Sequence, residues 1–265
     1  MNGVDPRPAA IERRLADVRR VIAVTGGKGG IGKSSVASLL ALVLAREGVR
    51  TGLLDLDLTA PSDHLILGID DRFPTEEFGV EPPCADGVHF MSVHYFLGDR
   101  AAPLRGGEVT QALSELLAIT RWPALDVLVV DMPPGLGDVA LDAARFVRRA
   151  EYLVVAGRSP LVLETVRRSL RLLHELRLPV LGVLENMRRE GADDGNDPVA
   201  TLARTFGVPH AGTLPWDESF EAALGEADRL LRTPLARALR EVAASRAPEL
   251  LSSRPDAPHG ARSAE

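Results

Sequence analysis

A glycine-rich loop between a strand-like run and a helix-like run constrains this chain more than any other feature. Residues 21–24 are apolar (Val-Ile-Ala-Val), residues 27–34 read Gly-x-x-x-x-Gly-Lys-Ser, and residues 36–45 carry apolar side chains at helical spacing. Glycines let the backbone turn successive N–H groups inward around a phosphate, and the start of the following helix adds a positive dipole. A strand–loop–helix context is what this motif requires. The sequence therefore predicts a phosphate-binding loop.

The polar residues of the loop have predicted roles. Lys33 should reach the terminal phosphates of a nucleotide, and the hydroxyl of Ser34 should bind Mg²⁺. The adjoining residues should approach the nucleotide through their backbone N–H groups. The nucleotide-binding residues expected in the loop are Gly27, Lys28, Gly29, Gly30, Ile31, Gly32, Lys33, Ser34 and Ser35.

Beyond the loop, strand-like runs alternate with helical patterns to about residue 245. Continuous apolar strands separated by helices are typical of a mostly parallel central sheet with helices on both faces, the α/β fold of a P-loop NTPase. Strands are expected at residues 21–25, 51–55, 87–93, 126–131, 152–156 and 179–184. Helices are expected at residues 10–20, 36–47, 109–119, 140–149, 163–176, 198–206, 219–224 and 234–244.

The two ends of the chain differ in composition from this alternating region. Residues 1–9 are typical of a loose tail, and the segment from residue 247 is rich in Ser, Pro, Arg and Ala. Segments of that kind bury too little apolar surface to order themselves. We expect an N-terminal tail and short helix over residues 1–19, one P-loop domain over 20–246 and a disordered tail over 247–265.

Acidic residues follow two of the expected strands, at the ends where an open parallel sheet binds its ligands. Asp131 ends one strand and is predicted to be the Walker B acid, while Asp57 should position the attacking water. Both are expected to hold Mg²⁺ through water. Asp55 is either a further site acid or an ordinary turn residue. The segment after Asp131 should change path when the γ-phosphate leaves, through the switch residues Pro134, Gly135 and Gly137.

Composition excludes several classes of function. The chain has 265 residues, 45% of them hydrophobic, and a net charge of −6, which argues against general binding to nucleic acid or anionic membranes. Its single cysteine, Cys84, cannot form an intrachain disulfide. The N-terminus lacks the apolar core of a signal peptide, and no run approaches the ~20 apolar residues that cross a bilayer. We expect a cytoplasmic protein with neither a nucleic acid nor a membrane as partner.

A second lysine in the loop, Lys28, is not needed by the common phosphate loop. The pattern Lys28-Gly-Gly-Ile-Gly-Lys33 resembles the deviant Walker A loop of the dimeric ATPases that include the nitrogenase iron protein, MinD, ParA and the Mrp/Nbp35 proteins. In that class the extra lysine crosses the dimer interface to the partner's nucleotide. The resemblance implies a homodimer in which Lys28 joins Lys33, Asp57 and Asp131 as a catalytic residue.

Further motifs resemble the Mrp/Nbp35 (ApbC-type) branch over roughly residues 18–245. Residues 131–138 read Asp-Met-Pro-Pro-Gly-Leu-Gly-Asp, where the branch carries Asp-x-Pro-Pro-Gly-Thr-Gly-Asp, and residues 185–187 read Glu-Asn-Met. The asparagine of that tripeptide contacts adenine in the class, so Asn186 is implied to bind the base, to which an amide offers a donor and an acceptor. Pro215 lies in a segment that resembles the family's segment near the base. The resemblance implies ATP and Mg²⁺ as cofactors, and slow hydrolysis without a partner.

The chain departs from the branch in its cysteines. Iron–sulfur carriers of this kind bear Cys-x-x-Cys shortly after the Asn-Met dipeptide, and two such pairs bridge a cluster at the dimer interface. Residues 188–198 contain no cysteine, and a homodimer would offer only two copies of Cys84, whereas a four-iron cluster takes four thiolates. The sequence therefore argues against carrying a cluster in the usual way. The acids between residues 190 and 197 are interpreted as a solvated loop, and no histidine as a metal ligand.

Three hypotheses for function remain open at this stage. The first is a dimeric, Mg²⁺-dependent ATPase switch that serves iron–sulfur cluster or metallocofactor assembly together with a client protein. The second is a spatial or regulatory ATPase of the MinD/ParA kind with no metal cluster; helix 234–244 is expected to dock on the core rather than on a membrane. The third is a kinase or GTPase that shares the loop, but no Asn-Lys-x-Asp guanine signature occurs, so ATP is preferred.

Overall fold

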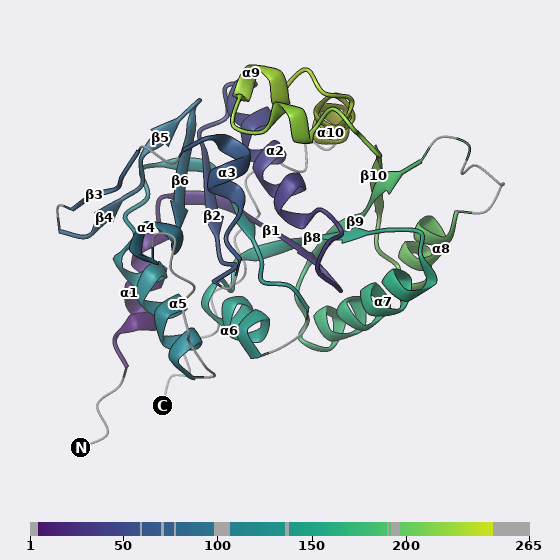
Figure 1. The fold of residues 1–265 in the computed structure, drawn as a ribbon. Coiled ribbons are helices and arrows are strands. Elements are labelled where there is room, and N and C mark those ends of the chain that lie inside the picture. Colours follow the sequence, from purple (N-terminus) through teal and green to yellow (C-terminus); the bar gives the residue numbers. More distant parts are fainter. Residues whose placement is uncertain are drawn as a thin grey trace, which may run out of the picture.

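An eight-stranded sheet runs through the middle of the protein, with helices on both of its faces (Figure 1). The structure, a computed structural model, describes residues 5–58, 60–69, 72–76, 78–97, 107–135, 138–189, 191 and 197–245, the side chain of Asp138 excepted. The strand order is β10-β9-β8-β1-β7-β2-β6-β5, and every neighbouring pair is parallel except β5 with β6. The strands are β1 (Val18–Gly26), β2 (Thr51–Asp55), β5 (Cys84–Ala85), β6 (Val88–Ser92), β7 (Leu125–Asp131), β8 (Ala150–Ala156), β9 (Val180–Arg188) and β10 (His210–Pro215), and a separate antiparallel pair is β3 (Thr75–Glu76) with β4 (Val80–Glu81). The predicted fold class is confirmed.

Strand β1 lies inside the sheet because it is apolar on both faces. Residues 21–24 are fully buried, as expected of a strand covered by helices on each side. β1 pairs with β7 on one side and β8 on the other, and its register sets Val24 opposite Asp131 of β7. The loop that follows β1 therefore leaves the sheet beside the acid that ends β7.

The helices form two layers that bury one apolar core on each face of the sheet. On one face lie α2 (Lys33–Arg46), α3 (Asp63–Leu67), α9 (Ala227–Leu230) and α10 (Pro234–Ser245), with the 3₁₀ turn η1 (Glu221–Ala223). On the other lie α1 (Arg7–Arg14), α5 (Gly107–Ile119), α6 (Asp138–Phe146), α7 (Pro160–Glu175) and α8 (Pro198–Thr205), and α4 (His94–Leu97) follows β6.

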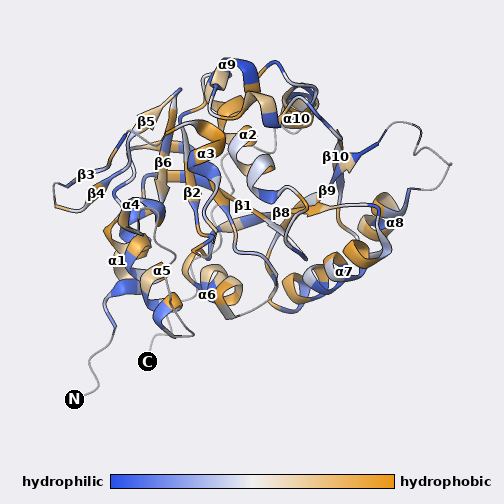
Figure 2. Ribbon diagram, viewed as in Figure 1, coloured by the Kyte–Doolittle hydropathy of each residue, from blue (hydrophilic) through white to orange (hydrophobic). Residues whose placement is uncertain are grey.

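The helix faces follow the expected apolar periodicity. In α7 the buried residues are Val166, Ser169, Leu170 and Leu173, spaced three and four apart, and Figure 2 shows hydrophobic and hydrophilic residues alternating along this helix. Helix α10 buries Leu235 and Leu239 in the same way and packs against α2. The expected docking of α10 on the core is thus confirmed.

The N-terminal segment differs from the expected helix at residues 10–20. Helix α1 ends at Arg14, and Val18 already pairs with Leu125 as the first residue of β1. The predicted helix is too long at its C-terminal end, because residues 18–20 belong to β1. Contacts distant in sequence hold them there, among them the ion pair between Arg20 and Glu151 of β8.

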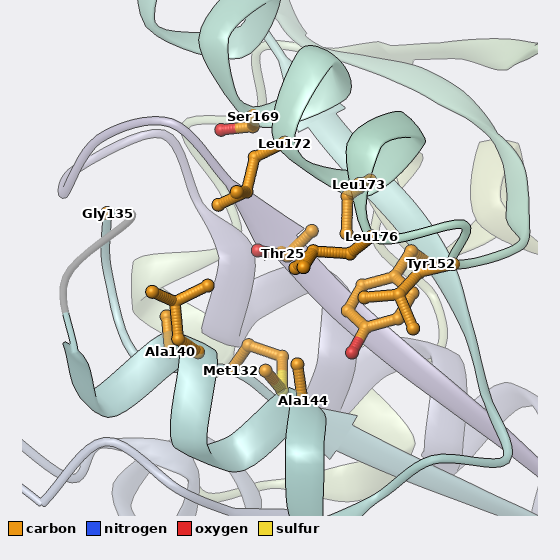
Figure 3. Close-up of a pocket in the computed structure, with 12 residues that line it drawn as sticks. Thr25, Met132, Gly135, Ala140, Ala144, Tyr152, Ser169, Leu172, Leu173 and Leu176 are labelled. Atoms are coloured by element: carbon orange, nitrogen blue, oxygen red, sulfur yellow. The ribbon is translucent and has the colours of Figure 1, made fainter.

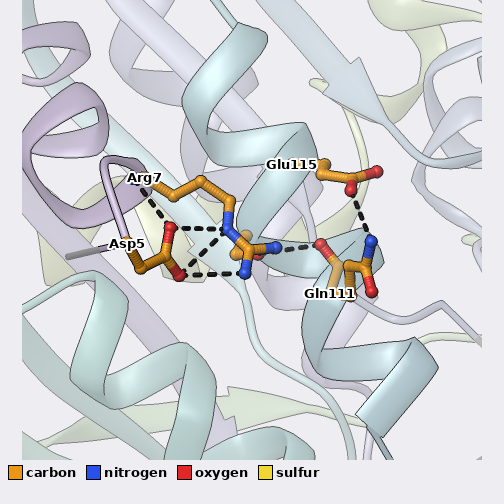
Figure 4. A network of polar contacts seen from close by, with 5 residues as sticks. Asp5, Arg7, Gln111 and Glu115 are labelled. Carbon is orange, nitrogen blue, oxygen red and sulfur yellow. Dashed lines mark hydrogen bonds and ion pairs between the residues drawn. The ribbon is translucent and has the colours of Figure 1, made fainter. Parts of the chain in front are cut away.

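Helix α1 is nevertheless part of the same core. Its Ile11 is buried and belongs to the cluster formed with α5. At the start of α1, Arg7 pairs with Asp5 at 2.9 Å (Figure 4). Nη1 of Arg7 also donates a 3.0 Å hydrogen bond to Oγ of Ser114 in α5. The division at residue 20 stays a prediction, and residues 247–265 lie outside the described part of the chain.

Several short elements were not expected from the sequence. They are the edge strands β5 and β10, the β3–β4 pair and the short helices α3, α4 and α9. Helix α6 ends at Phe146 rather than at residue 149, and β9 continues to Arg188. Among the described helices, none combines the length and the apolar character needed to cross a bilayer.

Candidate nucleotide-binding site

The glycine-rich loop has a backbone that only glycine adopts easily. Gly30 and Gly32 have φ of 77° and 79°, in the left-handed region that favours glycine. Gly32 also immediately precedes α2, and a Cβ there would lie 2.4 Å from Nδ2 of Asn186. That nitrogen donates a 2.9 Å hydrogen bond to the carbonyl of Ile31. Strand β9 thus braces the loop through one buried amide.

The middle of the loop faces open space. A Cβ at Gly27 would lie 2.4 Å from the carbonyl carbon of Thr165 in α7, so this glycine is needed for a close approach. A Cβ at Gly29 or at Gly30 would meet no heavy atom within 4 Å, and the side chain of Lys28 is exposed. The loop is therefore held at its two ends and free at its centre, as a ligand site requires.

The acids that end two neighbouring strands meet beside the loop. Asp55 of β2 and Asp131 of β7 are partners in the sheet register, and both are at most 1% exposed. Oγ of Ser34 donates a hydrogen bond of 2.5 Å to Oδ2 of Asp131. Lys33 is buried as well, and the charge of its ammonium partly opposes the rise that burial causes in the pKa of Asp131. The structure thus brings together Lys33, Ser34 and Asp131, the residues predicted to bind phosphate and Mg²⁺, with Asp55 beside them.

A third acid, Asp63, joins Asp55 and Asp131. It begins α3, is fully buried, and accepts a 2.8 Å hydrogen bond at Oδ1 from Oγ of Ser38 in α2. One oxygen from each of the three carboxylates lies within 4.8 Å of the others. Asp63 was not predicted from the sequence, because a five-residue helix has no detectable period. The signal that the sequence offers is an acid that follows Pro-Ser and precedes the short apolar run 65–67.

Burial dominates the electrostatics of this cluster. Removal from water raises the pKa of Asp55 to about 8, with the charge of Asp131 adding to the effect. Burial likewise raises the pKa of Asp63 and raises that of Asp131 to about 6, against the opposing hydrogen bond from Ser34. Three adjacent buried carboxylates thus disfavour full ionisation unless further positive charge is present.

The other predicted acid, Asp57, lies at the turn after β2. Its backbone N–H donates a 2.9 Å hydrogen bond to Oδ1 of Asp55, and its own Oδ1 accepts one of 3.1 Å from the N–H of Ala60. Asp57 is half-buried and adjoins the cluster without being part of it. Its role in positioning water stays a prediction.

The predicted switch segment leaves the end of β7. Pro134 is exposed and Gly135 has φ of 85°, so the chain turns sharply there. Gly137 lies outside the described residues.

Behind Gly135 is a small apolar pocket between α6 and α7, and Figure 3 shows the hydroxyl of Tyr152 directed into it. The labelled lining residues are Thr25, Met132, Gly135, Ala140, Ala144, Tyr152, Ser169, Leu172, Leu173 and Leu176. With so few polar groups, this pocket is no phosphate site.

The residues expected near the base lie on the two strands beyond β8. Asn186 is 5% exposed and turned to the loop, and Pro215 ends β10 opposite Arg188 of β9. Next to Pro215, the guanidinium of Arg189 stacks over the ring of Trp216, 5.3 Å from its centroid. The structure brings both residues to the same edge of the site, and their contact with a base stays a prediction.

A second group of titratable side chains lies on β9, on β10 and at the start of α8. Glu185, Asp197 and His210 place ligand atoms within 4.8 Å of one another. Glu185 is, however, fully buried and already paired with Arg188 at 3.2 Å and Arg158 at 3.8 Å. Two cations at Glu185 make this an ion-pair cluster rather than a metal site.

The site fits a nucleotide with Mg²⁺. The loop offers backbone N–H groups, Lys33 offers an ammonium, and Ser34 and Asp131 offer hard oxygen ligands. Oδ1 of Asp131 is buried and has no hydrogen-bond partner in the described part of the chain, as expected of an oxygen that awaits a hydrated cation.

Most of the chain matches one known protein family. The family model described as "ParA: NUBPL iron-transfer P-loop NTPase" matches residues 17–246. The chain belongs to this family. Membership in the NUBPL family agrees with the expected resemblance to the Mrp/Nbp35 proteins and makes the chain a P-loop NTPase.

Three curated relatives of this NUBPL-family chain carry the same name. An iron–sulfur cluster carrier protein of Pseudomonas fragi is 42% identical over 215 residues, which cover 76% of this chain and 74% of the relative. The protein of that name from Aquifex aeolicus is 34% identical over 223 residues, covering 80% and 61%. For that of Salmonella typhimurium the values are 40% over 173 residues, 64% and 47%. The chain thus spans between about half and three-quarters of the length of these relatives.

Solved structures show the same fold. A nucleotide-binding protein in complex with ADP from Archaeoglobus fulgidus has a TM-score of 0.70 at 26% identity, over 85% of this chain and 93% of that one. The cell division ATPase MinD of Pyrococcus furiosus has a TM-score of 0.64 at 22% identity, over 85% and 97%. The second likeness shows the fold alone.

Proposed function

We propose that this protein is a dimeric switch that binds and slowly hydrolyses ATP with Mg²⁺ and serves iron–sulfur cluster or metallocofactor assembly. The observation that carries the proposal is the hydrogen bond from Ser34 to Asp131, which joins the phosphate loop to the acid that begins the switch segment. The ADP complex of the Archaeoglobus relative supports an adenine nucleotide.

Each polar residue has a proposed part in hydrolysis. The backbone of residues 27–32 surrounds the phosphates, and Lys33 turns its ammonium to them. Ser34 binds Mg²⁺ directly and Asp131 through water, and the ion would neutralise charge on the phosphates. Asp57 orients the attacking water. Loss of the γ-phosphate releases the switch segment at Gly135. ATP hydrolysis thereby changes the shape of the protein surface around this segment.

The second copy of the chain is proposed to complete the site. Lys28 is exposed on a loop whose centre meets no neighbouring atoms, so it is free to enter a facing subunit. A positive charge supplied across an interface stabilises phosphate charge in the way an arginine finger does. In this proposal, ATP closes the dimer and hydrolysis opens it.

The cargo is proposed to be held by a client rather than by this chain. The relatives are named iron–sulfur cluster carrier proteins, but Cys84 is the one cysteine here, and a homodimer supplies two thiols against the four that a four-iron cluster takes. Cys84 lies in the edge strand β5 and pairs with His89, near the start of β6, whereas the phosphate loop follows the far end of β1. The residues present therefore do not fit a four-iron cluster between two copies.

The second candidate is a spatial or regulatory ATPase of the MinD/ParA kind. The missing cysteine pair favours it, and the fold likeness to MinD is compatible with it. A regulator would bind a membrane or DNA only when ATP is present, whereas an assembly factor would alter the rate at which a client receives iron and sulfide.

The test is an ATPase assay with Mg²⁺ on the full chain, on Lys33→Ala and on Lys28→Ala, followed by two functional assays. We expect turnover in the wild type and loss of turnover in both variants. ATP-dependent transfer of iron and sulfide to an acceptor protein would support the assembly role. ATP-dependent co-sedimentation with liposomes or DNA, without any effect on transfer, would replace it with the regulatory role.

A further inference from the structure

Three buried aspartates from three different elements converge beside the phosphate loop. Asp55 ends β2, Asp131 ends β7 and Asp63 begins α3, and none of them is more than 1% exposed. One oxygen from each lies within 4.8 Å of the other two. The strand register places Asp55 and Asp131 side by side. Asp63 comes from α3 and accepts a hydrogen bond from Ser38.

The hydrogen bonds of the cluster leave two oxygen atoms unsatisfied. Asp55 accepts at both oxygens, from the N–H of Asp57 at 2.9 Å and from Oγ of Ser92 at 3.1 Å. Asp63 and Asp131 each accept at one oxygen, from Ser38 and Ser34. Oδ2 of Asp63 and Oδ1 of Asp131 are buried without a hydrogen-bond partner in the described residues. Buried carboxylate oxygens are stable only with a donor or a cation.

The spacing of the three oxygens suits one metal ion. Oxygen ligands lie at about 2.1 Å from Mg²⁺ and about 2.4 Å from Ca²⁺, so two ligands of one ion are at most about 4.2 or 4.8 Å apart. The three carboxylate oxygens lie within 4.8 Å of one another, so small side-chain adjustments bring all three within reach of one hard cation. Carboxylates alone, without nitrogen or sulfur, select hard cations.

We propose that Asp63 completes, with Asp55 and Asp131, a site for a hard divalent cation that fills in the absence of nucleotide. The inference deepens the proposed function, in which the ion is shared with ATP and held by Ser34, Asp57 and Asp131. Here the cluster itself recruits the ion, and α3 contributes a ligand that the phosphate-loop motif does not contain.

Charge balance connects this site to nucleotide binding. Lys33 is the cation now close to Asp131, and one ammonium faces three carboxylates. Because one ammonium cannot balance three carboxylates, a divalent cation supplies the missing positive charge before ATP enters. The ion then still balances the carboxylates when Lys33 turns to the phosphates. A cation held by Asp63 and Asp131 also ties α3 to the start of the switch segment. The ion thus prepares the site before ATP enters.

Mn²⁺ binding to the nucleotide-free full chain tests the proposal. Free Mn²⁺ is measured by electron paramagnetic resonance after removal of bound metal with EDTA. We expect one saturable Mn²⁺ per chain, competed by Mg²⁺ and bound at least tenfold more weakly by Asp63→Asn. The matched control is Asp228→Asn, which removes an equal charge from an exposed ion pair with Arg46 and should bind as the wild type does. Absence of saturable binding in the wild type, or equal binding by Asp63→Asn, would overturn the proposal.

Thermal unfolding separates loss of the site from loss of the fold. In Asp63→Asn the amide oxygen can still accept from Ser38, and one of three adjacent buried carboxylates is removed, so we expect a melting temperature in EDTA equal to or above that of the wild type. Mn²⁺ should raise the melting temperature of the wild type and not that of the variant, because an ion that binds only the native state stabilises it. Asp55→Asn, at the end of β2, should likewise abolish the Mn²⁺-induced rise in melting temperature. Equal Mn²⁺-induced shifts in wild type and both variants would contradict the proposal.

Lys33→Ala distinguishes this inference from the proposed function. The variant should lose ATP binding yet keep or tighten Mn²⁺ binding, because a competing positive charge is gone. Mn²⁺ binding by a wild type that fails to bind ATP would overturn the proposed function alone. ATP hydrolysis without Mn²⁺ binding to the nucleotide-free protein would overturn the three-aspartate site alone.

Discussion

Ser34 of α2 and Asp131 of β7 are joined by a hydrogen bond of 2.5 Å from the serine hydroxyl to Oδ2 of the carboxylate. The bond connects the phosphate loop to the strand end from which the switch segment starts. Mg²⁺ would compete for the same hydroxyl and would reach the same carboxylate through water. Binding of the ion at Ser34 would therefore change the contacts of Asp131, which lies four residues before Gly135.

Ser34→Ala should weaken Mg²⁺-dependent ATP binding by about tenfold or more, because it removes a metal ligand and a hydrogen bond to a charged group. Isothermal titration with ATP in the presence of Mg²⁺ measures the change. The same titration in EDTA is the control, where the variant and the wild type should agree. Equal affinity of the two proteins in Mg²⁺ would exclude Ser34 as a metal ligand.

Gly27→Ala should destabilise the native state by roughly 1–3 kcal/mol, because its methyl group would lie 2.4 Å from the backbone of Thr165. Gly29→Ala is the matched control in the same loop, since a methyl group there meets no atom within 4 Å. Urea unfolding should separate the two variants. A Gly27→Ala protein as stable as Gly29→Ala would mean that α7 does not pack on the loop as described.

Asn186→Ala should loosen the phosphate loop, because its amide donates the 2.9 Å hydrogen bond to Ile31 and fills the space over Gly32. We expect a loss of about 1 kcal/mol in stability. If Asn186 also contacts adenine, the preference for ATP over GTP should fall with it. Competition of the two nucleotides for a fluorescent analogue measures that preference, and a variant with unchanged preference would remove Asn186 from the base site.

Stability below pH 4 should depend on Asp126. Hydrogen bonds from Arg50 hold the pKa of this carboxyl well below its usual range of about 4, so the folded state keeps the charge while the unfolded chain takes up a proton. The stabilisation is present above about pH 4 and is lost as the pH falls further. Because Arg50 is largely exposed, we expect Asp126→Asn to lose at most ~1 kcal/mol at pH 7.

Urea unfolding at pH 7, 4 and 3 measures this dependence. The decline in stability between pH 4 and 3 should be shallower in Asp126→Asn than in the wild type. Asp228→Asn breaks a more exposed ion pair and should follow the wild-type profile. An Asp126→Asn profile parallel to the wild type would show that the pair with Arg50 contributes nothing measurable.

The core of the fold could be predicted from the sequence, because buried parallel strands have nearly continuous apolar sequences. The strand at residues 51–55 has the expected bounds, and β7 differs by one residue. The phosphate loop could be predicted for a similar reason: its glycines, lysine and serine are adjacent in the chain, so no tertiary contact is needed to recognise them.

What depends on contacts distant in sequence could not be predicted. Val18 belongs to β1 because Leu125 lies beside it, and the helical spacing of residues 10–20 does not contain that information. Asp63 is a site residue only because α3 folds back over α2, which places it against Ser38 and Asp131. The sequence left the role of Asp55 open; burial and its register opposite Asp131 place it in the cluster of buried acids, and its function stays a prediction.

The most direct test of the proposed ATP-driven dimer is the mass of the protein in solution. Light scattering on the wild type and on Lys28→Ala, each without nucleotide and with ATP and Mg²⁺, measures whether nucleotide joins two copies and whether Lys28 is required. We predict a dimer stabilised by ATP in the wild type and a weaker one in Lys28→Ala. A wild type that binds ATP and stays monomeric in every condition would contradict the proposed role of Lys28 and of the second subunit.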